Sequence, residues 1–139
     1  MNITDDYIRG LVEAKGGFSF SSNGTKKIPT FYLHLDENDK ELLEAVRDHL
    51  GLESKIYVNG PYKSSIGIQK IKARLVVREF GKLKNIIIPF FYNNLKGCKS
   101  KQFEEWLEKI GNDPAIHHSY RLLHRLHKTG YWNKTQSLK

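Results

Sequence analysis

The chain has 139 residues and 39% of them are hydrophobic, which fits one domain over residues 1–139 and excludes an intrinsically disordered chain. No apolar run approaches the ~18 residues of a membrane-spanning helix, and the acidic first six residues contain no signal stretch, so we expect an intracellular protein with no membrane partner. Lysine and arginine number 23 against 15 acidic residues, a formal net charge of +8, which favours a polyanionic partner such as nucleic acid.

A helix followed by a β-hairpin is predicted at the N-terminus. Thr4 is a favourable N-cap for a helix over residues 5–15, which Gly16 and Gly17 end. The apolar period then changes to two, and Asn23-Gly24 is a strong hairpin signal. The alternating apolar residues are Phe18 and Phe20 before the turn and Phe31, Leu33 and Leu35 after it. The pattern predicts an antiparallel pair of strands with one apolar and one polar face.

A second helix and two more strands follow. The helix is capped by Asp36 or Asn38 and ends at Gly51, with an apolar stripe at Leu42, Leu43, Val46 and Leu50. Residues 55–59 and 72–78 have strand patterns, and residues 65–70 either extend the later strand or form one of their own.

The C-terminal part is predicted to be helical. Residues 80–91 have a helical pattern that Pro89 should end or kink, Ser100 caps a helix over 101–110, and Asp113-Pro114 opens a last helix to residue 128. The stripe of the middle helix is Phe103, Trp106, Leu107 and Ile110. The order is αββαββα with an additional C-terminal helix, an α+β fold in which one antiparallel sheet carries helices on one face.

Residues 8–16, IRGLVEAKG, have glycine at the third and ninth positions, apolar residues at the fourth and fifth, an acid at the sixth and a small residue at the seventh. This segment resembles the motif after which the LAGLIDADG homing-endonuclease family is named. Later residues resemble the family's C-terminal half, namely Ile87, Ile88, Pro89, Phe90, Phe91, Leu95, Lys99, Phe103 and Trp106. The resemblance covers residues 7–110 and implies a single-motif domain that acts as a homodimer along duplex DNA, with its sheet forming a saddle over the major groove.

Gly10 and Ala14 are four residues apart, so they share one face of the predicted helix. Small residues at this spacing let two helix backbones approach closely. The resemblance implies that this face is the dimer interface. The alternative is an ordinary core helix that happens to contain two small residues.

Lys15 stands at the eighth motif position, where the resemblance implies an acid that binds a divalent metal ion for phosphodiester cleavage. An ammonium group cannot ligate Mg²⁺ and repels it, so we expect cleavage to be lost or impaired and predict no metal site or cofactor. The resemblance implies a metal-dependent endonuclease, whereas Lys15 argues against cleavage, so whether the chain is an enzyme stays open. If it is active, Mg²⁺ would be its cofactor. Glu13 is the remaining candidate ligand, but it lies about 200° around the helix at ~100° per residue, which favours a structural contact. Lys15 is expected to neutralise phosphate instead, or to be a solvated residue at the helix end.

Alternation also assigns the two faces of the sheet. Ten apolar residues are expected to face the helices: Phe18, Phe20, Phe31, Leu33, Leu35, Ile56, Val58, Ala73, Leu75 and Val77. Their neighbours are polar or basic, with no acid, and are expected to face nucleic acid: Ser19, Ser21, Thr30, Tyr32, His34, Lys55, Tyr57, Asn59, Lys72, Arg74 and Arg78. Lys26 and Lys27, near the hairpin tip, and the segment 63–70 are expected to reach phosphates.

Four histidines gather in the last predicted helix: His117, His118, His124 and His127. A zinc site needs more ligands in a defined geometry, so we predict none. A basic helix lying along nucleic-acid backbone and a solvated helix face both remain open.

The leading functional prediction is a sequence-specific, duplex-DNA-binding homodimer whose cleavage is lost or impaired. One alternative is an RNA-binding protein, such as a maturase that helps an intron fold or a binder of another structured RNA, because RNA offers phosphates too. A further alternative is an active metal-dependent, site-specific endonuclease.

Overall fold

The computed structural model describes residues 1–59, 62–64, 67–69 and 71–133. The elements in chain order are α1 (Asp5–Lys15), β1 (Gly16–Asn23), β2 (Lys26–Asp36), the 3-10 turn η1 (Glu37–Asp39), α2 (Lys40–Leu50), β3 (Tyr57–Asn59), β4 (Tyr62–Ser64), β5 (Gly67–Gln69), β6 (Lys72–Val77), α3 (Phe80–Lys82), the π-helical turn η2 (Leu83–Ile87), α4 (Ile88–Phe91), α5 (Cys98–Asn112), the 3-10 turn η3 (His118–Tyr120) and α6 (Arg121–Lys128). The predicted α+β class and element order are confirmed.

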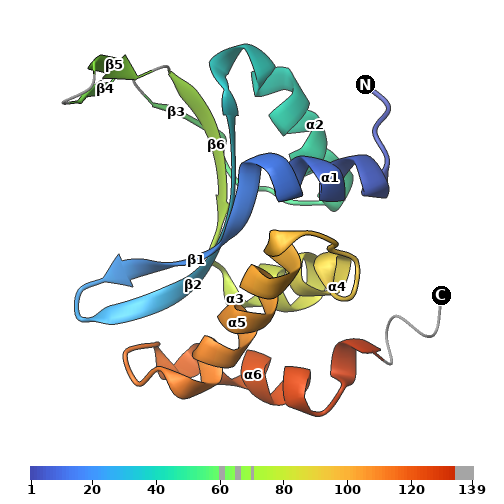
Figure 1. Ribbon diagram of the computed structural model, residues 1–139, viewed down its shortest axis with the longest axis vertical. Helices are drawn as coiled ribbons and strands as arrows, with labels where there is room; N and C mark the ends of the chain where they lie inside the picture. Colours follow the sequence, from blue (N-terminus) through green and yellow to red (C-terminus); the bar gives the residue numbers. More distant parts are fainter. Residues whose placement is uncertain (60–61, 65–66, 70, 134–139) are drawn as a thin grey trace.

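One antiparallel sheet organises the molecule. Its strand order is β1-β2-β6-β3, and β4 and β5 form a separate two-stranded hairpin. Figure 1 shows α1 to α5 on one side of the curved sheet, with the β1–β2 and β4–β5 hairpins projecting from its two ends toward the other side. We call the sheet face turned away from these helices the open face. The sequence left open whether residues 65–70 extend the later strand or form one of their own. Residues 65, 66 and 70 lie outside the described residues.

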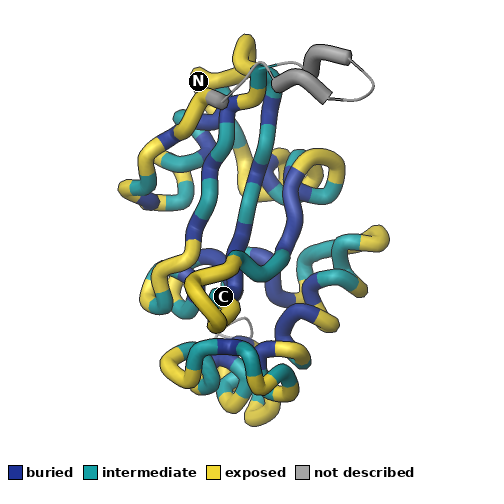
Figure 2. Tube along the Cα trace, turned by 90° about the vertical axis from the view of Figure 1, so that its left-hand side faces the viewer, coloured by how far each residue is buried: buried dark blue, intermediate teal, exposed yellow. Residues whose placement is uncertain are grey.

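The alternation of apolar residues predicted most of what the sheet contributes to the core. Eight of the residues expected to face the helices are buried: Phe18, Phe31, Leu33, Leu35, Ile56, Ala73, Leu75 and Val77. Figure 2, which looks onto the open face, shows buried and intermediate residues alternating along the strands. Phe20 is partly buried against the core, but Val58 is 46% exposed because it lies in a three-residue edge strand. Val58 nevertheless pairs with Ala73, so it lies on the helix side of the sheet as predicted.

The N-terminal helix and hairpin form as predicted, with one shift in the turn. Thr4 caps α1, since its hydroxyl accepts a hydrogen bond from the Tyr7 amide at 3.1 Å. Asn23 is the last residue of β1, so the two-residue loop is Gly24-Thr25 rather than Asn23-Gly24. Gly24 has a φ of +64°, the value that a type II′ turn requires at its first loop residue.

Gly16 and Gly17 end α1 for a packing reason, not as left-handed caps. Gly16 is extended, with a φ of −117°. A Cβ atom on Gly16 would lie 2.7 Å from the Tyr32 carbonyl oxygen, and one on Gly17 would lie 2.5 Å from the Tyr32 hydroxyl. The two glycines therefore allow α1 to continue directly into β1 beside β2.

The edge of β1 is closed by α5. The Gln102 side-chain oxygen accepts a hydrogen bond from the Phe18 amide at 2.9 Å, and the Trp106 indole donates to the Ser19 carbonyl at 2.8 Å. Phe103, Trp106, Leu107 and Ile110 are all buried, as their spacing predicted. Side chains thus satisfy backbone groups that an exposed edge strand would offer to another chain.

Pro89 does not end the helix over residues 80–91. The Ile88 amide donates to the Leu83 carbonyl, five residues back, so a π-helical turn immediately precedes the proline. In a regular α-helix the proline ring clashes with the carbonyl four residues before it, and a wider turn relieves that contact.

Two other predicted helix starts are wrong. α5 begins at Cys98 after Gly97, so Ser100 lies inside its first turn and its amide donates to the Gly97 carbonyl at 3.0 Å. Asp113-Pro114 opens a turn rather than a helix, because an Asp113 carboxylate oxygen accepts from the Ala115 amide at 2.9 Å. The last helix, α6, begins only at Arg121.

Candidate nucleic-acid interface and helix seam

Among the described residues, one side of α1 is left largely uncovered. Ile8 and Val12 are fully buried, while Gly10 and Ala14 are exposed and Tyr7 is 48% exposed. A Cβ atom on Gly10 would meet no heavy atom within 4 Å. These three exposed residues form what we call the seam face, and small residues at its centre let a second helix approach.

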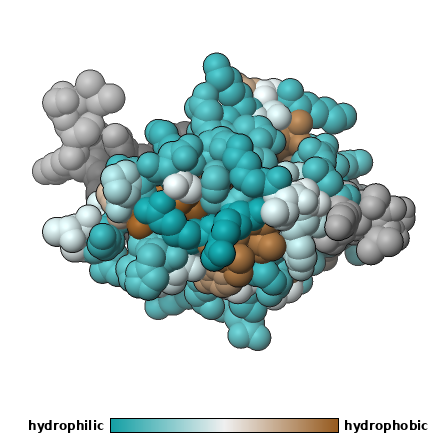
Figure 3. All heavy atoms as spheres, turned by 90° about the horizontal axis from the view of Figure 1, so that it is seen from below, coloured by the Kyte–Doolittle hydropathy of each residue, from teal (hydrophilic) through white to brown (hydrophobic). Residues whose placement is uncertain are grey.

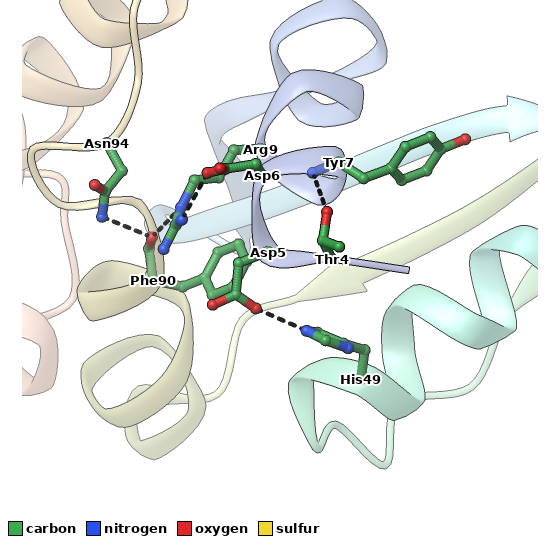
Figure 4. Close-up of polar contacts among 8 residues, drawn as sticks. All are labelled: Thr4, Asp5, Asp6, Tyr7, Arg9, His49, Phe90 and Asn94. Atoms are coloured by element: carbon green, nitrogen blue, oxygen red, sulfur yellow. Dashed lines mark hydrogen bonds and ion pairs between the residues drawn. The ribbon is translucent and has the colours of Figure 1, made fainter. Parts of the chain in front are cut away.

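The other side of α1 is anchored to α2 and α4. The Arg9 guanidinium donates to the Phe90 carbonyl at 3.0 Å and lies 4.4 Å from the centroid of its ring, and the Asp5 carboxylate is 2.7 Å from His49 Nε2. Figure 4 shows these contacts on one side of the helix and the Tyr7 side chain pointing away from them. The anchoring fixes the direction in which the seam face points.

A polar cluster from three strands occupies the middle of the open face. Arg74 pairs in register with His34 on one side and Tyr57 on the other, and its Nε donates to His34 Nε2 at 3.2 Å. The rings of Tyr32 and His34 lie 4.9 Å apart, and the Lys55 ammonium lies 5.6 Å from the Tyr57 ring centroid. We call these five residues the open-face cluster.

The surroundings of His34 favour the neutral form of its ring. Burial, and then the positive charges of Arg74 and Lys72, lower the pKa of the His34 imidazole below its ordinary value. A neutral ring can accept the hydrogen bond from Arg74 Nε, as the geometry requires. The bond orients the guanidinium, whose two terminal nitrogens are the pair that can face the O6 and N7 atoms of guanine.

The other expected contact residues differ in how exposed they are. Lys26 and Lys72 are exposed, Ser19 and Ser21 are partly buried, and Arg78 is exposed just beyond β6. Asn59 pairs with Lys72 in register, but its side chain, like the side chains of residues 62–64 and 67–69, lies outside what the structure describes.

Two of the expected contact residues have their side chains engaged within the chain. Thr30 is 4% exposed, and its hydroxyl bonds the Ser21 hydroxyl at 2.6 Å and the Ile28 carbonyl at 2.9 Å, so it cannot reach a ligand. Lys27 has the same parity along β2 as Phe31, which places it on the helix side, and its ammonium lies 3.2 Å from Asp113. The side of the sheet on which Lys27 lies could have been predicted from the alternation along β2.

Two open-face residues were missed from the sequence. Val76 pairs with Tyr32 and is partly buried, so the face is not wholly polar. Asp36 pairs with Lys72 at the end of β2, so the face is not free of acids, although the Asp36 carboxylate also caps η1 by accepting from the Asn38 amide at 3.0 Å. Both follow from the same alternation, because Val76 lies between Arg74 and Arg78 and Asp36 is the next alternate residue after His34.

Comparison with known proteins decides the family. The family model described as "LAGLIDADG endonuclease" matches residues 8–110, which is most of the chain. The chain belongs to the LAGLIDADG endonuclease family. No curated protein sequence matches it.

Solved structures of this family share the fold. The I-LtrWI LAGLIDADG homing endonuclease, bound to target DNA, is 27% identical with a TM-score of 0.64, over 85% of this chain and 40% of that one. I-GzeII, in complex with its DNA target, is 23% identical with a TM-score of 0.62, over 89% of this chain and 44% of that one. I-CpaMI, bound to uncleaved DNA, is 20% identical with a TM-score of 0.63, over 88% of this chain and 40% of that one. The present chain therefore spans less than half the length of these proteins.

The LAGLIDADG motif ends in a pair of side chains that do not fit a Mg²⁺ ion. Lys15 is exposed at the end of α1 and carries an ammonium group, which cannot ligate Mg²⁺. The Glu13 carboxylate accepts hydrogen bonds from the backbone amides of Lys96 at 3.0 Å and Gly97 at 2.6 Å, where α5 begins. The structural contact expected for Glu13 is thus present, and its oxygens are already occupied by protein donors.

Glu13→Gln should lower the free energy of unfolding by about 1 kcal/mol, because an amide keeps one acceptor oxygen and presents an NH₂ group to the other backbone N–H. The measurement is urea unfolding beside Glu105→Gln, which makes the same charge change at an exposed position of α5. An equal effect of the two substitutions would show that the Glu13 hydrogen bonds contribute no stability.

The histidines of α6 belong to a network between helices. His124 Nε2 lies 3.4 Å from Glu108, His127 Nε2 lies 3.5 Å from Glu104, and the Tyr92 hydroxyl is 2.7 Å from His127 Nδ1. Burial lowers the pKa of His127, although both glutamates oppose this. Within the described residues, no group of three or more histidine, cysteine or acidic side chains is arranged to hold a metal ion.

Lys128 completes this network by pairing with Glu108, so the basic residues of α6 are partly neutralised from α5. Figure 3 views the molecule from the end at which α6 lies, and this surface is largely hydrophilic with small apolar areas between. The contacts favour a solvated helix face over a basic helix that follows nucleic-acid backbone. None of the described helices is long and apolar enough to cross a membrane.

Proposed function

We propose that residues 1–139 form one LAGLIDADG domain that binds duplex DNA sequence-specifically, as a homodimer, with its cleavage activity lost or impaired. The observation that carries the proposal is the open-face cluster, which places Tyr32, His34, Arg74, Tyr57 and Lys55 together on a sheet face that α1 to α5 leave uncovered. Hydrogen-bonding and cationic groups on a curved face suit the edges of bases in the major groove. The net charge of +8 supplies attraction to phosphate.

The homodimer is supported by the length comparison and by the seam face. The DNA-bound relatives are covered to 40–44% of their length by this chain, which leaves room in each for a second domain of similar size. A second copy of this chain would supply that domain, and Gly10 and Ala14 offer an unpacked face for it. In this arrangement two open faces lie side by side and contact twice the length of duplex.

The basic and polar residues have two expected roles in this complex, contact with bases and contact with phosphates. Arg74 and its neighbours in the open-face cluster contact base edges, while Lys26 at the hairpin and Lys72 at the strand end contact phosphates. Lys15, at the end of the seam helix, lies closest to the two-fold axis and neutralises the backbone there directly, without a metal ion.

The function is tested by selecting binders from a random duplex-DNA pool, with a structured-RNA pool of matched length as control. We expect a preferred duplex sequence with two related half-sites, and an affinity that falls steeply with salt because lysine and arginine displace counterions. Enrichment of a structured RNA without any duplex sequence would favour the RNA-binding alternative. A salt-insensitive interaction would count against binding through basic side chains.

Arg74→Ala should weaken binding to the selected site by ~1–3 kcal/mol, and binding to random duplex by less, if its guanidinium reads a base edge. Arg74→Lys keeps the charge but loses the planar fork, so it should lose site preference while keeping affinity for random duplex. Fluorescence-anisotropy titrations of both DNAs measure the difference. Arg47→Ala is the control, because Arg47 carries the same charge on α2, on the helix side of the sheet. Equal losses on both DNAs would mean that Arg74 contacts only backbone.

A further inference from the structure

The outer half of the β1–β2 hairpin extends beyond the four-stranded sheet. β6 pairs with β2 only over residues 31–36, so residues 26–30 have β1 as their one strand partner in the described sheet. An isolated two-stranded hairpin is marginally stable in water. Something else must fix this half of the hairpin if it is to hold a set direction.

The segment after α5 occupies the place beside β2 that β6 leaves free. The Lys27 amide donates to the Ala115 carbonyl at 2.8 Å, and the His117 amide donates to the Lys27 carbonyl at 3.1 Å. These bonds form a parallel bridge between Lys27 and Ile116, and the Ile116 side chain is 1% exposed. The Lys27 ammonium adds an ion pair with Asp113 at 3.2 Å.

Arg121 holds this segment in shape. Its guanidinium donates to three backbone carbonyls, those of Gly111 at 2.9 Å, Asp113 at 3.0 Å and Ile116 at 3.4 Å. The fork of one side chain therefore ties the end of α5, the turn and the bridge residue together. The neighbouring Tyr120 hydroxyl donates to the Arg78 carbonyl at 2.7 Å, which joins the same segment to the end of β6.

We propose that residues 113–121 are a brace that fixes the direction of the β1–β2 hairpin, and that Arg121 is a positioning residue which thereby determines how well the domain discriminates its DNA sequence. The inference rests on the proposed duplex binding. The brace lies outside residues 8–110, which the family model matches. Recognition of bases needs side chains held within about 0.5 Å of the productive geometry, whereas attraction to phosphate does not. Loss of the brace should therefore lower specificity more than affinity.

Arg121→Lys is the decisive variant because it keeps the charge but replaces the planar fork by one ammonium nitrogen. The three carbonyls are bonded from two separate guanidinium nitrogens, a geometry that a single nitrogen does not reproduce. We expect the ratio of random-duplex to selected-site dissociation constants to fall by about tenfold, with affinity for random duplex unchanged within roughly twofold. Hydrogen exchange at the Lys27 and His117 amides should accelerate, since these protons are protected by the bridge. Arg125→Lys, the same change at an exposed position of α6, should alter neither quantity.

Ile87→Val tests whether lower stability by itself changes specificity. It removes one methyl group from a fully buried core side chain away from the brace. Ile87→Val should lower the melting temperature and leave the specificity ratio unchanged. If Arg121→Lys accelerates exchange at Lys27 but leaves the ratio intact, the brace does not govern specificity and the inference fails while duplex binding stands. If wild-type protein prefers no duplex sequence, both the proposed function and the inference fail, whatever the exchange rates.

Discussion

Gly10→Leu is expected to convert a dimer into a monomer, with the dimer dissociation constant raised at least about a hundredfold because two helix backbones can no longer meet at the seam face. The substituted side chain fits the single chain, since no heavy atom lies within 4 Å of a Cβ at this position. Leucine also favours the helical state over glycine, so the isolated subunit should gain about 0.5–1 kcal/mol of stability. Dissociation with increased stability distinguishes a lost interface from a damaged fold.

Sedimentation velocity across the micromolar range measures the assembly state, with and without a selected duplex. Gly81→Leu is the matched control, because Gly81 is also an exposed glycine in a helical segment with nothing within 4 Å of its Cβ, but it lies in α3 and away from the seam face. Gly81→Leu should sediment as wild type does. A wild-type chain that stays monomeric at micromolar concentration, and binds one copy per half-site without contact between copies, would exclude the seam.

Elements with a local cause were predictable from the sequence. The Thr4 cap, the stripe of α5 and the alternation of β1 and β2 depend on residues within a few positions of one another, and the structure reproduces all of them. The seam face was predictable for the same reason, because Gly10 and Ala14 lie four apart on one helix.

Contacts between distant segments were beyond the sequence patterns. The Glu13 carboxylate bonds amides more than 80 positions later, and the partner of Arg74 depends on the register between β2 and β6. Asp113-Pro114 shows how such contacts override a local signal. Its residues favour a helix start, but the bridge to Lys27 and the three carbonyl bonds of Arg121 stabilise a turn instead.

The wild-type chain is expected not to cleave duplex DNA at a measurable rate with Mg²⁺, even at its selected site. In the proposed homodimer, two Lys15 side chains, one from each copy, would put positive charge where the family's motif implies anionic oxygen ligands. At about 4 Å, a unit charge beside a divalent ion costs on the order of 2 kcal/mol in a water-like dielectric and about 8 kcal/mol at the effective value near protein surfaces. The Glu13 oxygens each accept a hydrogen bond, from Lys96 and Gly97, so the contact that holds Glu13 opposes its turning toward an ion.

Lys15→Glu tests whether the loss of this one acid is what prevents cleavage. We expect the variant to cut the selected site in a Mg²⁺-dependent manner, while wild type and Lys15→Gln do not. Lys15→Gln removes the repulsion without supplying a carboxylate, so activity in Lys15→Glu alone would show that ligation of the ion is the missing contribution. Activity in both variants would mean that repulsion alone suppresses cleavage. The opposite result would be double-strand cleavage by wild type that is lost in a folded Glu13→Gln variant. It would show that Glu13 is the metal ligand and that the domain is an active endonuclease.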